Sequence, residues 1–385
     1  MTRIRRENFL WHDRYSQPPA RLDVQSREIQ LVVWQRTVSV IGALTRRRVR
    51  VCLGALWLID AALQANPAFF TANWWRDSLA QSAMGEPAWV RASILWAVGI
   101  VAPHAGALNC LFVLAQLFIG ISLVAGRFEA VAIILSVPYA FGVWWVGEGL
   151  GGIPSGFAMM ATGAPGAVLL YPAIGLLAFP DTDVVVDPSP GDDVVGDGCR
   201  DEVIGQSTHK VCRPVARRAG LAVWAVVWAG QALLEVLSVL PVAQVMRANV
   251  EEYSAGNPGW LVALGGPFAF LGDHHPIVLA TGLLVVQVIV GLGVLWGRSR
   301  RLMLAAGIVV AFVFWVGFEY LGGIATGGAT DLNSGPLLIL LGAALWPPRG
   351  VTARGTGFAA GRVFAGSRRG ELVIAVTSRV ASPKT

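Results

Sequence analysis

Long apolar runs constrain the fold of this chain more than any other feature of its sequence. A helix that crosses a bilayer needs about 20 mainly apolar residues, because every backbone polar group must be satisfied within the segment. Eight runs reach or approach this length, and they cover residues 51–70, 106–125, 128–146, 164–179, 221–242, 276–296, 302–318 and 333–346. The sequence therefore predicts an all-α, polytopic membrane protein with eight transmembrane helices, of which the fourth and the eighth are short.

Composition excludes most other classes of protein. Hydrophobic residues make up 55% of the chain and charged residues 14%, which is typical of membrane proteins and not of soluble α/β enzymes. The net charge of +6 does not indicate nucleic acid binding, since the basic residues lie at the ends of the apolar runs. The four cysteines have neither a Cys-x-x-Cys nor a zinc spacing, so neither a disulfide framework nor a thiol-redox centre is predicted.

Basic residues indicate how the chain crosses the membrane, because cytoplasmic loops carry an excess of Lys and Arg. If all eight runs span and the N-terminus is cytoplasmic, only 3 of the 30 basic residues lie outside, namely Arg76, Arg91 and Arg247. This pattern predicts an integral protein of the plasma (inner) membrane with both termini in the cytoplasm. The interrupted apolar stretch at 29–44 is predicted to be an amphipathic helix on the inner surface, with a ninth span as the alternative.

The second half of the chain repeats the first at an offset of 171 residues. One ungapped register aligns identical residues, among them Trp57 and Trp228, Trp89 and Trp260, His104 and His275, Gln116 and Gln287, Trp144 and Trp315, and Glu148 and Glu319. Each half holds four runs, an even number, so the halves are predicted to be parallel four-helix repeats related by a pseudo-two-fold axis along the membrane normal. The predicted order is a basic cytoplasmic tail (1–50), repeat A (51–180), a flexible cytoplasmic linker (181–218), repeat B (219–347) and a second basic cytoplasmic tail (348–385).

Each repeat has a long outer segment between its first two runs. These segments are rich in tryptophan: Trp74, Trp75, Trp89 and Trp96 in repeat A, and Trp260 in repeat B. Because tryptophan rings favour the headgroup level of a bilayer, the segments are predicted to be interfacial helices. A re-entrant segment that lines a cavity is the alternative.

Polar residues at membrane depth are the first candidates for function, because an ionisable group there is costly to bury. The first helix of each repeat places an acid and an amide four residues apart, and hence on one face: Asp60 with Gln64, and Gln231 with Glu235. Their natural hydrogen-bond partners lie in the second helices, at Gln116 and Gln287. Two interpretations stay open, an interhelical hydrogen-bond network that holds the bundle together and a substrate or proton site.

A second group of polar residues is expected at the outer ends of the helices. Glu148 and Glu319 end the third runs, while His104 and His275 precede the second runs. A four-helix unit is narrow enough to bring such ends within about 10–15 Å, which predicts one polar pocket in each repeat. In repeat B a candidate divalent-metal site arises, with interfacial polar residues as the alternative; its members are Asp273, His274, His275, Glu319 and Asp331.

The second helices carry a short repeated pattern, Gln116-x3-Gly120-x5-Gly126-Arg127 and Gln287-x3-Gly291-x5-Gly297-Arg298. Together with the helix count and spacing, this pattern resembles the DoxX-like family of small four-helix membrane proteins associated with quinol oxidation and other redox partners. The resemblance implies two fused units with a quinone-binding or oxidoreductase-partner role. Many members carry a glutamate where this chain has Gln116 and Gln287, so a proton-linked role of that carboxylate is not carried over.

Two other functions stay open at the level of the sequence. The duplicated architecture and the acids at membrane depth favour a transporter or carrier of a small molecule or ion. The tail and the linker favour a membrane scaffold or assembly factor. No nucleophile with its base, phosphate-binding loop or dinucleotide fingerprint is recognisable in the sequence, so no catalytic activity of its own is predicted. The expected partners are the lipid bilayer and a membrane or redox protein.

Overall fold

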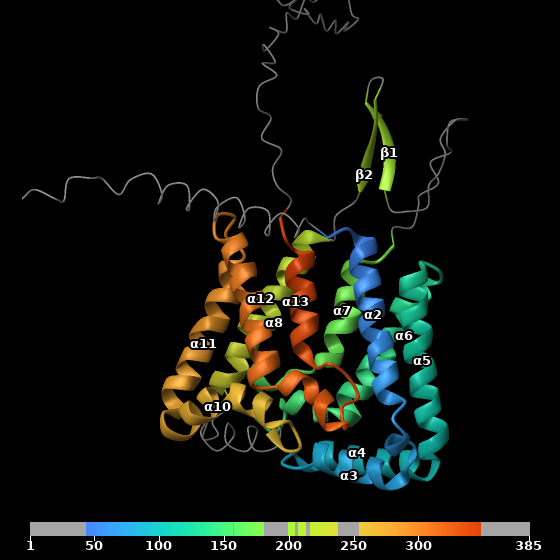
Figure 1. Ribbon diagram of the computed structural model, residues 1–385, viewed down its shortest axis with the longest axis vertical. Coiled ribbons are helices and arrows are strands. Elements are labelled where there is room, and N and C mark those ends of the chain that lie inside the picture. The colour runs from blue at the N-terminus through green and yellow to red at the C-terminus, as the bar shows by residue number, and fades with distance from the viewer. Residues whose placement is uncertain are drawn as a thin grey trace, which may run out of the picture. The chain divides into compact units, whose positions relative to one another are not determined.

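The computed structural model describes residues 44–156, 158–180, 199–204, 207–212, 216–237 and 254–347. These residues are mainly helical, with one pair of short strands (Figure 1). The surface helix predicted at 29–44 falls, except for its last residue, outside the described residues, and so does the C-terminal tail.

A helix lies in each of the eight apolar runs. In the first half these helices are α2 (Arg46–Gln64), α5 (Ala105–Ala125), α6 (Glu129–Gly142) and α7 (Ala167–Leu177). In the second half they are α8 (Arg217–Leu237), α11 (Pro276–Gly293), α12 (Arg300–Gly317) and α13 (Ser334–Ala344). Within the described residues, helices thus supply the backbone hydrogen bonding that each apolar run requires.

Five segments of the described chain are long and apolar enough to cross a membrane: Ala88–Ala125, Glu129–Val146, Arg217–Val236, Pro276–Gly293 and Arg300–Thr326. Helices α7 and α13 are apolar but have only 11 residues each. Helix α2 has 19 residues, but its arginine-rich first turns and Asp60 make it less apolar than the others. The fold is that of a helical membrane protein.

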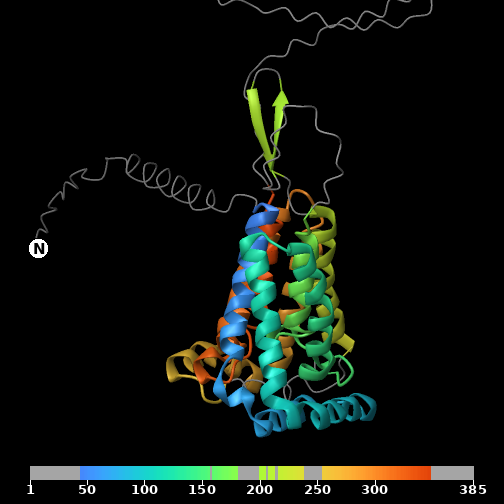
Figure 2. The same ribbon diagram turned by 90° about the vertical axis from the view of Figure 1, so that its right-hand side faces the viewer.

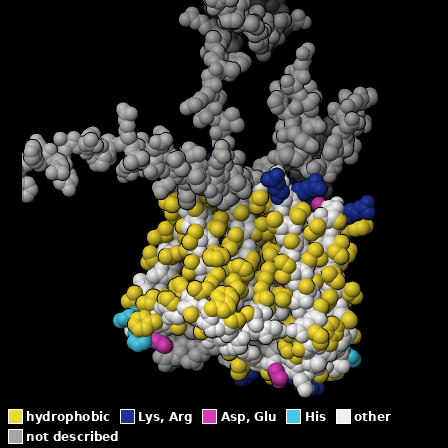
Figure 3. All heavy atoms as spheres, in the orientation of Figure 1, with side chains coloured by type: hydrophobic (Ala, Val, Ile, Leu, Met, Phe, Trp, Pro, Cys, Tyr) yellow, Lys and Arg dark blue, Asp and Glu magenta, His cyan; other side chains and the backbone are white. Residues whose placement is uncertain are grey.

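The surface of the bundle is apolar along its flank. Large hydrophobic side chains of the outer helices are exposed, for example Leu114, Ile134, Val226 and Ile289. On the face shown in Figure 3, hydrophobic side chains cover the region between the arginines at one end and the histidines and acids at the other. A continuous apolar surface of this kind indicates contact with lipid rather than water.

Three further helices lie across one end of the bundle, opposite the end where α2 begins (Figures 1 and 2). They are α3 (Ala72–Ser82), α4 (Ala88–Val101) and α10 (Gly259–His274). Trp89 and Trp260, which match in the repeat, are each 62% exposed. The described parts of the outer segments therefore contain helices, as the sequence predicts. Their exposed tryptophans are of the kind expected at the headgroup level.

Short turns complete the connections. The 3-10 turns are η1 (Pro67–Phe70), η2 (Ala102–His104), η4 (Gly149–Gly152), η5 (Met160–Thr162) and η6 (Tyr320–Thr326), and the π-turn η3 covers Val143–Gly147. In the predicted linker, strand β1 (Cys199–Ile204) pairs antiparallel with β2 (Ser207–Cys212). The sequence predicts a flexible linker at 181–218, and this hairpin was not predicted.

The centre of the bundle is built from both halves of the chain. Helices α7 and α13 contact each other, and both contact α2 and α8. Helices α5 and α6 flank this centre on one side, and α11 and α12 flank it on the other (Figure 1). One continuous hydrophobic core includes Trp57 and Tyr171 from the first half and Trp228 and Leu341 from the second.

Glycines of the repeated pattern fix how closely the first two helices of each half approach. A Cβ atom on Gly120 would lie 2.8 Å from the Leu58 side chain and 2.9 Å from the Gly54 carbonyl oxygen. A Cβ atom on Gly291 would lie 2.8 Å from the backbone nitrogen of Ala229. Small residues at such crossings allow helix backbones to pack directly, and the two glycines contact the first helix of their half at matching positions, Leu58 and Ala229.

Candidate functional site between the two halves

The chain that follows Glu148 folds back into the bundle. The indole nitrogen Nε1 of Trp144 donates to the carbonyl oxygen of Pro165. The carboxylate of Glu148 accepts from the backbone N–H of Val168 at the start of α7, with an N···O distance of 3.4 Å. Both contacts hold the segment 149–166 against the end of α6, so Glu148 faces the interior of the protein.

The second half repeats this arrangement. Trp315 Nε1 donates to the Leu332 carbonyl oxygen at 2.9 Å. Glu319 accepts from the hydroxyl of Ser334 and from the backbone N–H of Gly335, the latter at 3.2 Å. The acceptor Leu332 and the donor Gly335 follow Pro165 and Val168 by 167 residues rather than 171. The second half is therefore four residues shorter than the first between its glutamate and its last helix, while the same two contacts are present.

A left-handed turn after each glutamate makes the reversal possible. Leu150 and Gly151 have φ values of +57° and +65°, and the matching Leu321 and Gly322 have +59° and +71°. A Cβ atom on Gly151 would lie 1.9 Å from the Pro165 carbonyl oxygen, so only glycine fits there. These turns carry both glutamates inward.

The inward turn corrects the predicted pairing of histidines and glutamates. His104 and His275 are exposed at the starts of α5 and α11, whereas Glu319 has 0% exposure. His274 stacks on Phe270 with ring centroids 4.4 Å apart. The predicted ligands Asp273, His274, His275, Glu319 and Asp331 are not assembled, and the described residues contain no group of three His, Cys, Asp or Glu side chains suited to a metal ion.

Asp60 is buried at the contact between the halves, with 2% exposure. The hydroxyl of Tyr171 on α7 donates to its Oδ2 atom. From the second half, the backbone N–H of Leu332 and the carboxylate of Asp331 lie beside it. Asp331 is itself held by the backbone N–H of Asn333 at 2.7 Å.

The reciprocal contact joins the first helix of the second half to the loop of the first. Glu235 accepts from the backbone N–H of Met160 at 3.2 Å and from Gln287 Nε2 at 2.9 Å. Gln231 Nε2 donates to the Ala158 carbonyl oxygen at 2.8 Å. We call the segments after the two glutamates, 149–166 and 320–333, the inward loops; each touches the first helix of the other half.

Of the two glutamines predicted to pair with the buried acids, one does so and the other does not. Gln287 does pair with Glu235, but Gln116 donates to the Tyr139 hydroxyl at 2.7 Å instead of to Asp60. Gln64 donates to Asn109 Oδ1 at 2.5 Å. The polar network between helices that the sequence predicts is present, with tyrosines in places where amides were expected.

Burial shifts the carboxyl groups around the inward loops toward the neutral form. Burial raises the pKa of Glu148 to about 8, with a further rise from nearby Asp331 that the Val168 N–H partly offsets. Burial also raises the pKa of Asp331. A protonated carboxyl can donate as well as accept a hydrogen bond, so this region can exchange protons and bind polar groups of either kind.

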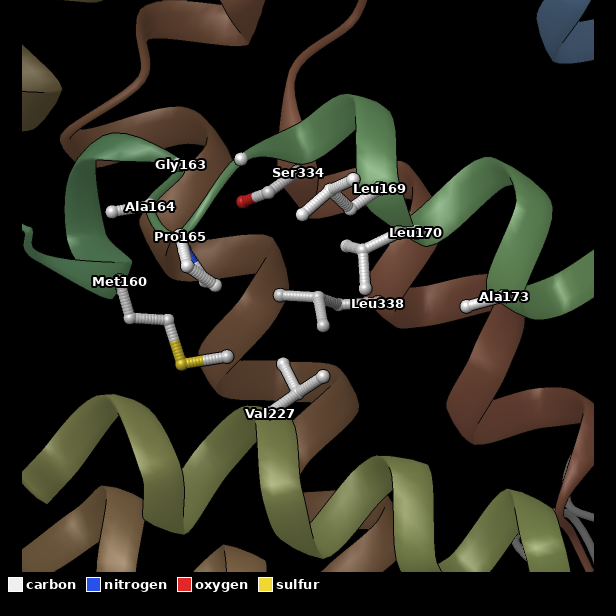
Figure 4. Close-up of a pocket in the computed structure, with 11 residues that line it drawn as sticks. Met160, Gly163, Ala164, Pro165, Leu169, Leu170, Ala173, Val227, Ser334 and Leu338 are labelled. Atoms are coloured by element: carbon white, nitrogen blue, oxygen red, sulfur yellow. The ribbon is translucent and has the colours of Figure 1, made fainter. Parts of the chain in front are cut away.

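A mainly apolar cavity of about 180 Å³ lies between the halves (Figure 4). Its wall from the first half is the inward loop and α7, and its wall from the second half is formed by Val227 of α8 with Ser334 and Leu338 of α13. The Ser334 hydroxyl that lines the cavity is the donor to Glu319. The cavity is smaller than most drug-sized pockets, and it is lined by Met160, Gly163, Ala164, Pro165, Gly166, Leu169, Leu170, Ala173, Val227, Ser334 and Leu338.

Three residues of this region were missed by the sequence reading: Tyr139, Tyr171 and Ser334. Both tyrosines lie within apolar runs, and a buried tyrosine hydroxyl normally needs a partner, so they could have been singled out. Ser334 gave no such signal, because a serine near a helix start has its ordinary role as a cap.

Comparisons of the chain with protein-family models, with curated proteins and with solved structures find no match. The resemblance to the DoxX-like family therefore rests on the repeated pattern of the second helices and on the helix count and spacing in the sequence.

Proposed function

We propose that the chain forms eight transmembrane spans in two parallel four-helix repeats in the inner membrane, with both termini on its cytoplasmic side. The equivalent contacts of Trp144 with Pro165 and of Trp315 with Leu332 support the repeat. The starts of α2 and α8 support the orientation, because both begin at arginines and such ends stay in the cytoplasm. The short helices α7 and α13 span because the other helices and the inward loops shelter their ends.

Within this architecture the protein binds a small, mainly apolar ligand with a hydrogen-bonding group, between the repeats. The observation that carries the proposal is the apolar cavity whose wall includes the Ser334 hydroxyl and, behind it, the buried Glu319 carboxyl. A quinone fits this chemistry. Its ring is flat and apolar, and its oxygens accept hydrogen bonds or, in the quinol, donate them. Any electron transfer belongs to a partner oxidoreductase, as the resemblance to the DoxX-like family implies.

Two neighbouring residues of α8 provide a matched test. Val227 lines the cavity, while Val226 is 69% exposed. Val227→Trp fills the cavity and should weaken binding of a radiolabelled short-tailed quinone in lipid nanodiscs at least tenfold, whereas Val226→Trp should bind like the wild type. Absence of saturable binding to the wild type, or equal binding by the two folded variants, would contradict the proposal.

A second function, a proton-coupled carrier, is favoured by the reciprocal contacts of the inward loops at Asp60 and Glu235. Binding sites at the interface of repeats, with polar groups at membrane depth, are common in secondary transporters. Proteoliposomes that accumulate a solute under a proton gradient, with no quinone binding, would favour this function. Co-purification of a stoichiometric protein without either activity would favour a scaffold.

A further inference from the structure

Among the buried polar atoms of repeat A that have no hydrogen-bond partner in the described residues, three have counterparts in repeat B. They are the indole Nε1 of Trp57, the Oδ1 atom of Asp60 and the Oε1 atom of Gln116. The three residues are only 1%, 2% and 5% exposed. Buried polar groups are nearly always paired, so each of these atoms needs an explanation.

Repeat B has unpartnered atoms at the same three positions. Trp228 Nε1, Gln231 Oε1 and Gln287 Oε1 have no partner within the described chain, and each residue stands 171 positions after its counterpart in repeat A. Their exposures are 0%, 1% and 0%. The recurrence shows that the unpaired atoms are a property of the repeat rather than an isolated defect of packing.

The residues in repeat A form one cluster inside the four-helix unit. Helices α2 and α5 cross at Gly54 and Gly120, and Trp57 and Gln116 each lie about one turn from that crossing, toward the same end. The Trp57 ring packs against the ring of Tyr139, at 5.3 Å between centroids, and against that of Tyr171, at 4.6 Å.

Hydrogen bonds link the same side chains. Tyr171 donates to Asp60, and Tyr139 accepts from Gln116. The cluster therefore draws on all four helices of the repeat, with Trp57 and Asp60 on α2, Gln116 on α5, Tyr139 on α6 and Tyr171 on α7.

Donors and acceptors in this cluster are balanced. Trp57 offers an N–H, and Tyr139, whose oxygen already accepts from Gln116, offers its O–H. Asp60 Oδ1 and Gln116 Oε1 offer acceptors. Two donors and two acceptors match the bonding capacity of water, and buried waters typically make about three such bonds. We propose that the interior of each repeat binds water at this position, as a site separate from the ligand cavity between the repeats.

The two water sites differ in what they can do. In repeat B, Gln231 replaces Asp60, and Val310 and Leu338 stand at the positions of Tyr139 and Tyr171. In repeat B the unpartnered atoms belong to an indole and two amides, while the carboxyl beside them, Glu235, accepts from Gln287 Nε2 and from the Met160 N–H. In repeat A one of the unpartnered atoms is itself a carboxyl oxygen, so the water there can exchange protons with Asp60 directly.

Magnetisation transfer from water to tryptophan indole protons tests the proposal in the full chain. The signals of Trp57 and Trp228 are assigned by their loss in Trp57→Phe and Trp228→Phe, and both should show cross-peaks to water although the rings are buried. Trp224 is the matched control, because it is also 0% exposed but donates to the Val290 carbonyl oxygen at 3.1 Å. Its indole proton should show no cross-peak.

A second variant shows whether the water belongs to the cluster. Gln116→Leu removes one acceptor of repeat A and should weaken the water cross-peak of Trp57 while leaving that of Trp228 unchanged. The proposal is overturned if Trp57 and Trp228 resemble Trp224, or if the Trp57 cross-peak survives unchanged in folded Gln116→Leu protein. Quinone binding plays no part in this readout.

Discussion

Replacement of Glu148 by glutamine should remove a distinct part of the pH dependence of the protein's stability. The pKa of Glu148 rises from 4.5 to about 8 in the folded protein, first through burial and then through the charge of Asp331. Because the folded-state pKa is the higher one, the folded protein holds a proton that the unfolded chain releases. The stability contribution is complete below about pH 4.5 and is lost as the pH rises through about 8.

The difference between these two pKa values corresponds to at most about 5 kcal/mol of unfolding free energy, which is large against a typical total of about 5–15 kcal/mol. Glu148→Gln cannot ionise, yet its side-chain oxygen can still accept from the Val168 N–H. The variant should therefore keep the fold and lose stability less steeply than the wild type as the pH rises. A residual slope is expected from Asp331, whose pKa is also raised by burial, and from the buried carboxyl groups of Asp60 and Glu319.

Thermal melting in detergent, recorded from about pH 5 to about pH 9, measures this effect. The control is Asp77→Asn, which removes an exposed acid of α3 and should melt like the wild type at every pH. The reasoning is refuted if Glu148→Gln retains the wild-type slope, or if the wild type gains stability as the pH rises toward 8.

Three further predictions concern packing and topology. Asp60→Leu should be less stable than Asp60→Asn by about 1–3 kcal/mol, because only asparagine still accepts from Tyr171; equal melting temperatures would contradict this contact. Gly120→Leu should destabilise by about 1–3 kcal/mol, since even its Cβ would lie 2.8 Å from a side chain of α2, whereas Gly142→Leu faces open space and should melt like the wild type. Cysteines placed in residues 181–218 should react only from the cytoplasm, and labelling by an impermeant reagent in intact cells would remove the proposed orientation.

Much of the helical fold could be predicted from the sequence, because the length of an apolar run and the glycine that ends it determine a helix locally. The predicted run at 106–125 corresponds to α5 (Ala105–Ala125), which ends where Gly126 adopts a φ of +71°. The predicted run at 276–296 corresponds to α11 (Pro276–Gly293). The hairpin in the linker was not predicted, since its polar strands carry no clear alternation of apolar residues.

The site could be predicted only in part. Glu235 and Gln287 were expected to meet because they face each other on neighbouring helices, and they do. The inward course of the chain after each glutamate depends on the left-handed conformation of Leu150 and Leu321. Leucine rarely adopts this conformation, so its presence at these positions could not be predicted from the sequence. The contact of Asp60 with the backbone N–H of Leu332 depends in turn on that inward course and on the packing of the two halves, so spacing along the chain could not predict it.

Photolabelling of the cavity tests the central claim most directly. A photoreactive short-tailed quinone should label residues 160–173 and the neighbourhood of Val227 and Leu338 in nanodiscs, as mapped by mass spectrometry. An excess of unlabelled quinone should abolish this labelling, and so should Val227→Trp. Labelling confined to the exposed flank of the bundle, with no competition by unlabelled quinone, would contradict a ligand site between the two halves.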